Sequence, residues 1–171
     1  MAHRRLKRAL LPIAAVLAVV ACGSDVLAPE DIEFVDELGI DLSVMTRTAS
    51  GLYIQDLTVG DGALVESGDS VVVDYSGWLP NGALFDSSTD EPFSIGVGRL
   101  IDGFDEGVIG MRVGGTRALV IPPALAYGDR VIGGIPANST LVFRVTVKAV
   151  VVPSPDPAET EVSGAAGPYR P

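Results

Sequence analysis

The chain has 171 residues, a length that suits one domain of ordinary size with tails. Because 47% of its residues are hydrophobic and 6% aromatic, wholesale disorder is not expected. Its formal net charge is −10. That charge argues against a nucleic-acid partner, because phosphate binding depends on clustered lysines and arginines.

The first 21 residues have the composition of a secretory signal peptide. Basic residues in MAHRRLKR precede the apolar run LLPIAAVLAVVA, which is too short to span a membrane comfortably. The stretch VVAC resembles a bacterial lipobox, in which the cysteine, here Cys22, becomes the lipidated first residue. The alternative is an unpaired cysteine just inside a signal peptide. We predict a signal peptide over residues 1–21 and a lipoprotein anchored to a membrane of the bacterial cell envelope, on its extracytoplasmic side.

Processing at this site would change the chemistry open to the protein. It would remove four basic residues and no acid, which lowers the net charge from −10 to −14, and it would remove the only histidine, His3. Cys22 is the only cysteine. The mature chain would therefore have neither a Ser-His nor a Cys-His nucleophile system, and no His/Cys zinc site.

Residues 22–49 form an acidic segment between the predicted anchor and the main domain. Its apolar residues recur at roughly helical spacing: Ile32, Phe34, Val35 and Leu38. This spacing predicts a short amphipathic helix around residues 29–38, ended by Gly39. The segment could serve as a spacer arm or dock on the main domain, and the pattern does not decide between the two.

Residues 50–152 alternate short apolar segments with Gly-rich turns, as expected of strands in an antiparallel sheet. The clearest alternation is in TLVFRVTVKAV, with one apolar face: Leu141, Phe143, Val145 and Val147. A second strand, VVVDYSGWL, has a similar face: Val71, Val73, Tyr75 and Gly77. In TRALVIPP we expect Leu119 and Ile121 to point inward.

One segment of this region, IDGFDEGVIGMRVGG, fits a short helix instead. Phe104, Val108 and Met111 are spaced i, i+4 and i+7, and acidic residues lie near the expected helix start. Gly110, or the pair at 114–115, would end the helix. The last segment, residues 153–171, is Pro-rich and acidic and should be a disordered tail. The sequence therefore predicts an α+β domain whose sheet curls over one helix.

Four segments place an aromatic side chain beside a polar group: DYSG with Tyr75, FDSS with Phe85 and Asp86, AYGD with Tyr127, and LVFRV with Phe143. Such a composition is expected of a concave site with few polar groups, although ordinary core aromatics would look the same. Asp86 is the most ambiguous of these residues. It is either a solvated turn residue or a carboxylate at the mouth of an apolar cavity.

The order and spacing of three longer stretches resemble the FKBP-type peptidyl-prolyl cis/trans isomerases: VVVDYSGWLPNGALFDSS, PFSIGVGRLIDGFDEGVIGMRVGGTRALVIPPALAYG and IPANSTLVFRVTV. The resemblance spans about residues 50–150. It implies a curved antiparallel sheet of five or six strands wrapped around one short helix. It also implies an isomerase that acts on X-Pro bonds of envelope or secreted proteins, needs no metal or cofactor, and is inhibited by FK506-like macrolides.

The resemblance also assigns site residues. As catalytic residues it implies Tyr75, Asp86, Tyr127 and Phe143. As substrate-binding residues it implies Phe85, Phe93, Leu100, Ile101, Phe104 and Ile135. Phe104 would form the pocket floor in place of the family's usual tryptophan, and the Tyr127 hydroxyl and Ile101 N–H would bind substrate carbonyls. The arginine that accompanies the pocket carboxylate in relatives has no counterpart in the stretch TDEP after Ser88.

Two alternatives from other classes remain at this stage. The same pocket could capture prolyl segments of unfolded envelope proteins with little or no turnover, as a chaperone module does. The domain could also be a scaffold in a surface lipoprotein whose acidic terminal segments engage a partner.

Overall fold

The computed structural model describes residues 26–151, so the predicted signal peptide, Cys22 and the C-terminal tail lie outside the described residues. The described chain forms one six-stranded sheet in the order β1-β2-β5-β6-β3-β4, with all neighbours antiparallel. The strands are β1 (Thr46–Arg47), β2 (Tyr53–Thr58), β3 (Ser70–Trp78), β4 (Leu84–Ser94), β5 (Thr116–Ile121) and β6 (Leu141–Val151). One α-helix, α1 (Asp102–Val108), and four short 3-10 turns complete the described chain.

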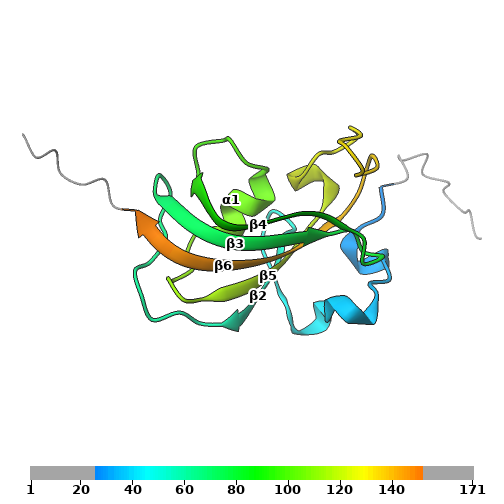
Figure 1. The fold of residues 1–171 in the computed structure, drawn as a ribbon. Helices are drawn as coiled ribbons and strands as arrows, with labels where there is room; N and C mark the ends of the chain where they lie inside the picture. Colours follow the sequence, from blue (N-terminus) through cyan, green and yellow to red (C-terminus); the bar gives the residue numbers. More distant parts are fainter. Residues whose placement is uncertain (1–25, 152–171) are drawn as a thin grey trace, which may run out of the picture.

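The sheet curves around α1, which lies against one face of it (Figure 1). The alternation in β3 and β6 explains this arrangement, because Val71, Val73, Val145 and Val147 are fully buried on the face toward the helix. From the helix side, Phe104 and Val108 are buried in the same core cluster. The predicted fold, a curved antiparallel sheet wrapped around one short helix, is confirmed.

Two glycines let α1 approach β5 closely. A Cβ atom at Gly103 would lie 2.3 Å from Ile121 Cγ2, and one at Gly107 would lie 2.6 Å from Leu119 Cδ2. Because these glycines are four residues apart, they present one bare stripe of the helix to the strand. Phe104, next to the stripe, is thereby held over the sheet. The helix ends at Val108, and Gly110 follows with φ of +80°, in agreement with the first of the two predicted stops.

The amphipathic helix expected over residues 29–38 is wrong. The structure has two separate 3-10 turns there, Pro29–Asp31 and Asp36–Leu38, with an extended stretch between them. The extended backbone is held by the turn between β3 and β4, since the Val35 N–H donates to the Pro80 carbonyl at 3.0 Å. Gly39 does end the second turn, in the left-handed conformation. A further 3-10 turn, Leu42–Val44, leads into β1.

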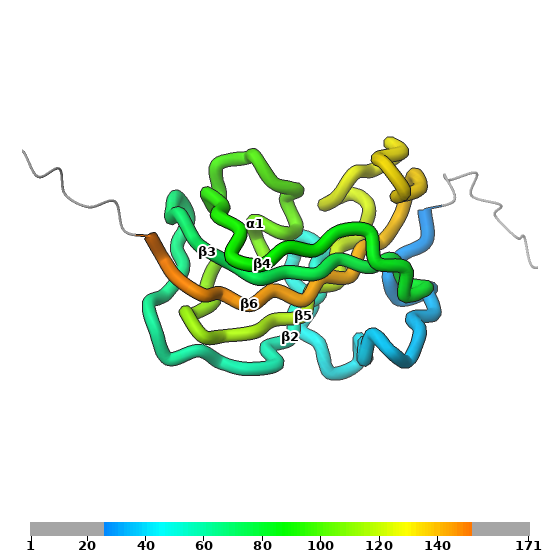
Figure 2. The backbone as a smooth tube through the Cα atoms, in the orientation of Figure 1, coloured from blue at the N-terminus to red at the C-terminus, as the bar shows by residue number. Residues whose placement is uncertain are grey.

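This N-terminal segment docks on the outer face of the sheet. Leu38 and Met45 are buried in a second cluster with Val120 and Val142, which belong to β5 and β6. Of the two readings that the sequence left open, docking is the one observed for the part that is described, and the sheet already begins at Thr46. Figure 2 shows this segment, in blue, at one end of the sheet, and the end of β6, in orange, at the other. No helix among residues 26–151 has the length and apolar character that a membrane span requires.

Candidate active site

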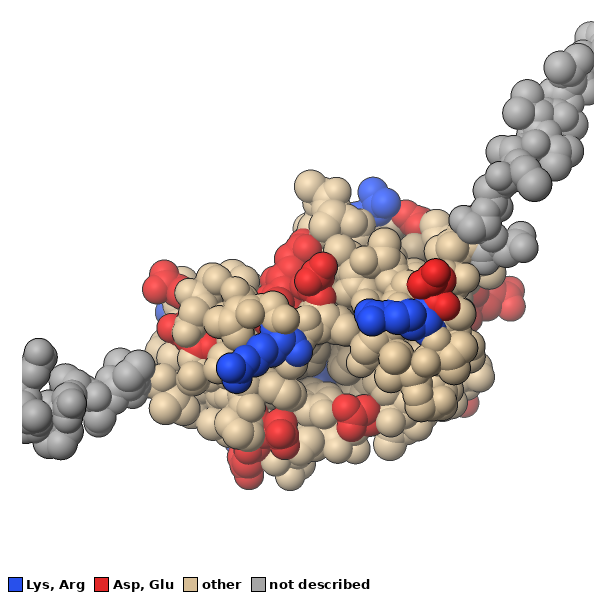
Figure 3. All heavy atoms as spheres, turned by 90° about the horizontal axis from the view of Figure 1, so that it is seen from above, with Lys and Arg blue, Asp and Glu red and all other residues tan. Residues whose placement is uncertain are grey.

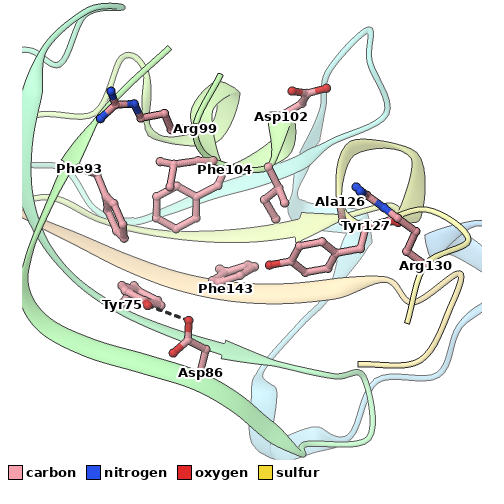
Figure 4. A pocket seen from close by; sticks show the side chains of 12 residues that line it. Tyr75, Asp86, Phe93, Arg99, Asp102, Phe104, Ala126, Tyr127, Arg130 and Phe143 are labelled. Atoms are coloured by element: carbon pink, nitrogen blue, oxygen red, sulfur yellow. Dashed lines mark hydrogen bonds between the residues drawn. The ribbon is translucent and has the colours of Figure 1, made fainter. Parts of the chain in front are cut away.

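A cavity of about 470 Å³ opens between the concave face of the sheet, α1 and the segment that follows β5 (Figure 4). It brings together residues from five parts of the chain. Its lining consists of Tyr75, Asp86, Phe93, Arg99, Leu100, Ile101, Asp102, Phe104, Ala126, Tyr127, Arg130 and Phe143.

Four aromatic rings form the inner wall of this cavity. The Phe104 ring, from α1, lies 5.5 Å from that of Phe143 and 5.6 Å from that of Phe93, both nearly edge-on. Tyr75 completes the group, with its ring 6.1 Å from Phe104. Edge-to-face packing of this kind stabilises each ring in one orientation. Phe104 is only 4% exposed and lines the cavity from α1; its role as the floor of a substrate pocket, which the resemblance implies, stays a prediction.

Gly77 makes room for this wall. It faces Phe143 across the β3–β6 ladder and Asp86 across the β3–β4 ladder. A Cβ atom at Gly77 would lie 2.6 Å from Phe85 Cζ and 2.8 Å from Phe143 Cε1. The bare backbone at this position therefore lets Phe85 pack edge-on against Phe143 at 5.5 Å.

Tyr75 and Asp86 form the polar pair of the cavity. The Tyr75 hydroxyl donates to Asp86 Oδ2 at 2.8 Å. Burial first, and the Asp86 carboxylate next, raise the pKa of Tyr75 well above its ordinary value, so this hydroxyl stays a hydrogen-bond donor. Asp86 lies inside β4, opposite Gly77, and lines the cavity. The interpretation of Asp86 as a turn residue is therefore wrong.

Two residues that line the cavity carry a hydrogen-bond donor without a partner in the described part of the chain. The Tyr127 hydroxyl points toward Phe143 (Figure 4), and no hydrogen bond of this hydroxyl occurs within residues 26–151. Ile101 is the N-cap residue of α1, and its carbonyl accepts from Phe104 and Asp105. Its own N–H has no acceptor among the described residues. Both donors are thus free for a ligand.

The loops that carry these donors are held from behind. Asp105 is 8% exposed and accepts from the Gly96 N–H at 2.9 Å, which ties the loop of residues 96–101 to the helix. On the other side of the cavity, the Gly128 carbonyl accepts from the Asn138 N–H at 2.7 Å. Tyr127 is therefore placed at a constrained turn. The acidic residue expected to favour the helix start has this second role, which sequence spacing did not indicate.

Two of the predicted site residues do not line the cavity. Ile135 is 5% exposed and belongs to the hydrophobic core, and Phe85 packs behind Phe143. Four lining residues were not predicted: Arg99, Asp102, Ala126 and Arg130. Their only signal in the sequence is position, because each lies within three residues of a predicted site residue.

Metal chemistry has no evident basis in the described part of the chain. Among residues 26–151, no group of three or more histidine, cysteine, aspartate or glutamate side chains is placed to hold a metal ion. The cavity instead offers aromatic surface, the two donors just described, and the charged side chains of two aspartates and two arginines. Such a site can bind a small apolar group and hold the carbonyls on either side of it.

The sequence of this chain matches a known protein family. A family profile described as "FKBP-type peptidyl-prolyl cis-trans isomerase" matches residues 62–148. The chain is 52% identical over 102 residues to "FK506-binding protein 4" of Gibberella zeae, a match that covers 58% of this chain and 21% of that protein. It is 47% identical over 105 residues to "FK506-binding protein" of Neisseria meningitidis, covering 58% of this chain and 96% of the relative.

Solved structures agree with these matches. The crystal structure of AtFKBP13 has a TM-score of 0.59 and 37% identity, over 63% of this chain and 98% of that one. That of FkpA from Escherichia coli has a TM-score of 0.60 and 36% identity, over 67% and 55%. The chain spans only about a fifth of the length of the fungal relatives. The match to the Neisseria protein nevertheless covers nearly all of that relative, and the profile matches half of this chain. The protein therefore belongs to the FKBP-type peptidyl-prolyl cis-trans isomerase family.

Proposed function

We propose that this protein catalyses cis–trans isomerisation of X-Pro bonds in peptide segments that enter the cavity. The observation that carries the proposal is the aromatic wall of Tyr75, Phe93, Phe104 and Phe143 with two free donors at its edge. A proline ring is a small apolar group that suits such a wall. The Ile101 N–H and the Tyr127 hydroxyl would then hold the substrate carbonyls.

The chemistry of the bond explains why no nucleophile is needed. An X-Pro bond prefers trans by only about 0.5–1 kcal/mol, whereas rotation about a peptide bond faces a barrier of roughly 18–20 kcal/mol. The planar amide carries separated charge that water solvates well, and the twisted amide carries less. An apolar cavity therefore penalises the planar form more than the twisted one, which amounts to preferential binding of the transition state.

The Tyr75–Asp86 pair would lie beside the twisting amide. Because the raised pKa of Tyr75 keeps its hydroxyl protonated, the pair presents one fixed hydrogen-bond geometry across the neutral pH range. Asp86 accepts from Tyr75 where relatives have an arginine partner, so the carboxylate keeps a partner of its own. We assign this pair to orienting the amide.

The test is a protease-coupled isomerisation assay with a Leu-Pro tetrapeptide, using the chain without residues 1–21, with and without an FK506-like macrolide. Tyr127→Phe removes one free hydroxyl, and we expect it to weaken substrate binding by about 0.5–1.5 kcal/mol, or roughly two- to tenfold. Tyr53→Phe, on the outer face, is the matched control. An isomerisation rate no higher than the uncatalysed rate in solvent would refute the proposed catalysis. Saturable peptide binding without turnover would instead indicate a binding module.

We further propose that the protein works on proline-containing segments of envelope proteins, attached to a membrane through a lipid on Cys22. The support is the VVAC motif after a basic and apolar leader. Several lipid chains on Cys22 would attach the protein firmly to the membrane, whereas a single chain would bind only marginally. Fractionation of cells that express Cys22→Ser tests this, since recovery of the variant with the membranes would contradict lipid anchoring.

A further inference from the structure

Three of the seven basic residues in the described part of this acidic protein are paired with an acidic neighbour. Three ion pairs occur among residues 26–151: Arg47 with Glu30, Arg117 with Asp56, and Lys148 with Asp74. Two arginines that line the cavity, Arg99 and Arg130, are in none of them. The rim of the candidate active site therefore carries positive charge that the described chain does not neutralise.

The two arginines lie at opposite ends of the cavity. Arg99 lies above Phe93 and Phe104, and Arg130 lies beyond Tyr127 (Figure 4). The only hydrogen bond found for either side chain within the described residues is a long one, from Arg130 Nε to the Tyr127 carbonyl at 3.5 Å. Seen from above, this face carries basic groups on either side of a hollow, among several acidic groups (Figure 3).

Two carboxylates also line the cavity and have to be weighed against the arginines. Asp86, although exposed, already accepts the Tyr75 hydroxyl. Asp102 lies at the start of α1, on the far side of Phe104 from Asp86 (Figure 4). Neither carboxylate lies within 4.0 Å of an arginine nitrogen. Apart from the long contact of Arg130 Nε, the two guanidinium groups thus have no hydrogen-bond partner among residues 26–151, and each can bind a carboxylate in a bidentate way.

We propose that Arg99 and Arg130 make the enzyme selective for prolyl segments that carry an acidic side chain close to the X-Pro bond. The inference rests on the proposed function and specifies its substrate class. The protein as a whole is negative and repels acidic segments at long range. The two arginines reverse this locally, because a peptide seated in the cavity passes one guanidinium at each end.

The test compares peptides with a common Leu-Pro core and glutamate, glutamine or lysine at neighbouring positions, first before and then after the core. With the chain without residues 1–21, we expect kcat/KM for the glutamate peptide to exceed that for the glutamine peptide by about two- to fivefold per contacted arginine, the range of solvent-exposed ion pairs. The lysine peptide should be the slowest. The difference should shrink as salt is raised, because salt screens exposed charges.

Variants assign the preference to its residues. Arg99→Gln and Arg130→Gln should each lower the ratio of glutamate to glutamine rates, and the double variant should bring it to one. Because a ratio is compared, a general loss of activity does not imitate this result. Arg144→Gln is the matched control, since Arg144 is exposed, is in none of the three ion pairs found in residues 26–151, and is on β6 next to Phe143 but outside the cavity lining. It should leave the ratio unchanged.

Several outcomes would overturn the proposal. Equal rates for the three peptides would do so, and so would a preference that survives in the double variant. Faster turnover of the lysine peptide would show that Asp86 and Asp102 dominate the rim. If no peptide is isomerised, the proposed function fails, but calorimetric binding of the same peptides still measures the charge preference. Selective binding of the glutamate peptide would then support the arginine rim without catalysis.

Discussion

Replacing Gly77 by alanine tests how the aromatic wall of the cavity is built. Alanine in place of glycine within a strand normally stabilises a protein, by about 0.5–1 kcal/mol, because glycine loses more backbone freedom on folding. At Gly77 the added Cβ would lie 2.6 Å from Phe85 Cζ and 2.8 Å from Phe143 Cε1. Both separations are about 1 Å shorter than the favourable carbon–carbon distance of roughly 3.5–4.0 Å.

The expected sign is therefore the opposite of the usual one. Phe85 is partly exposed and can turn away, but Phe143 is 4% exposed and is enclosed by other rings. Overpacking of a buried site costs about 1–3 kcal/mol. After the favourable backbone effect is subtracted, we expect Gly77→Ala to lower the free energy of unfolding by about 1–2 kcal/mol. Because Phe143 is part of the cavity wall, KM for a Leu-Pro peptide should rise as well.

The measurement is urea unfolding followed by far-UV circular dichroism, together with the isomerisation assay. Gly134→Ala is the matched control, because a Cβ there meets nothing within 4 Å and its φ is outside the left-handed range. It should be as stable as the unchanged protein or slightly more stable, with unchanged kinetics. A Gly77→Ala variant that behaves like this control in both assays would refute the steric argument.

Two further predictions concern the polar contacts. Tyr75→Phe keeps the ring and removes the hydrogen bond to Asp86, so it should cost less than about 1 kcal/mol of stability but lower kcat/KM. In an ultraviolet titration, the variant should lack one phenol whose pKa in the unchanged protein is above the ordinary tyrosine range. The Tyr53 hydroxyl, a backbone hydrogen bond and Arg47 lower the pKa of Glu30, so its stabilising effect is present above the unfolded-state pKa and is lost as the pH falls through the folded-state pKa. The stability gap between the unchanged protein and Glu30→Gln should therefore narrow on acidification below about pH 4, as measured by urea unfolding with Trp78 fluorescence. A gap that stays constant from pH 7 to pH 3 would show that the Glu30 contact does not contribute.

The sequence alone determined the sheet, the helix and most of the aromatic wall. Alternation from Phe143 to Lys148 in β6 and from Ser70 to Val73 in β3 indicated which face of each strand is buried, because a half-buried strand has a period of two. The i, i+4, i+7 spacing placed Phe104 and Val108 on the buried side of α1 for the same kind of reason. The order of the motifs then added Tyr127, which no periodicity marks.

Tertiary structure decided the remaining features, because they depend on residues far apart in the chain. The segment of residues 29–38 has helical spacing, yet a hydrogen bond from Val35 to Pro80 and burial against β5 and β6 hold it as separate turns. Ile135 looked like a pocket residue, but the loop places it in the core. Arg99 and Arg130 line one cavity only because the folding of the sheet and α1 places their two loops on either side of it. Local pattern specifies which face of an element is buried, whereas the neighbours across that face are set by the packing of the whole domain.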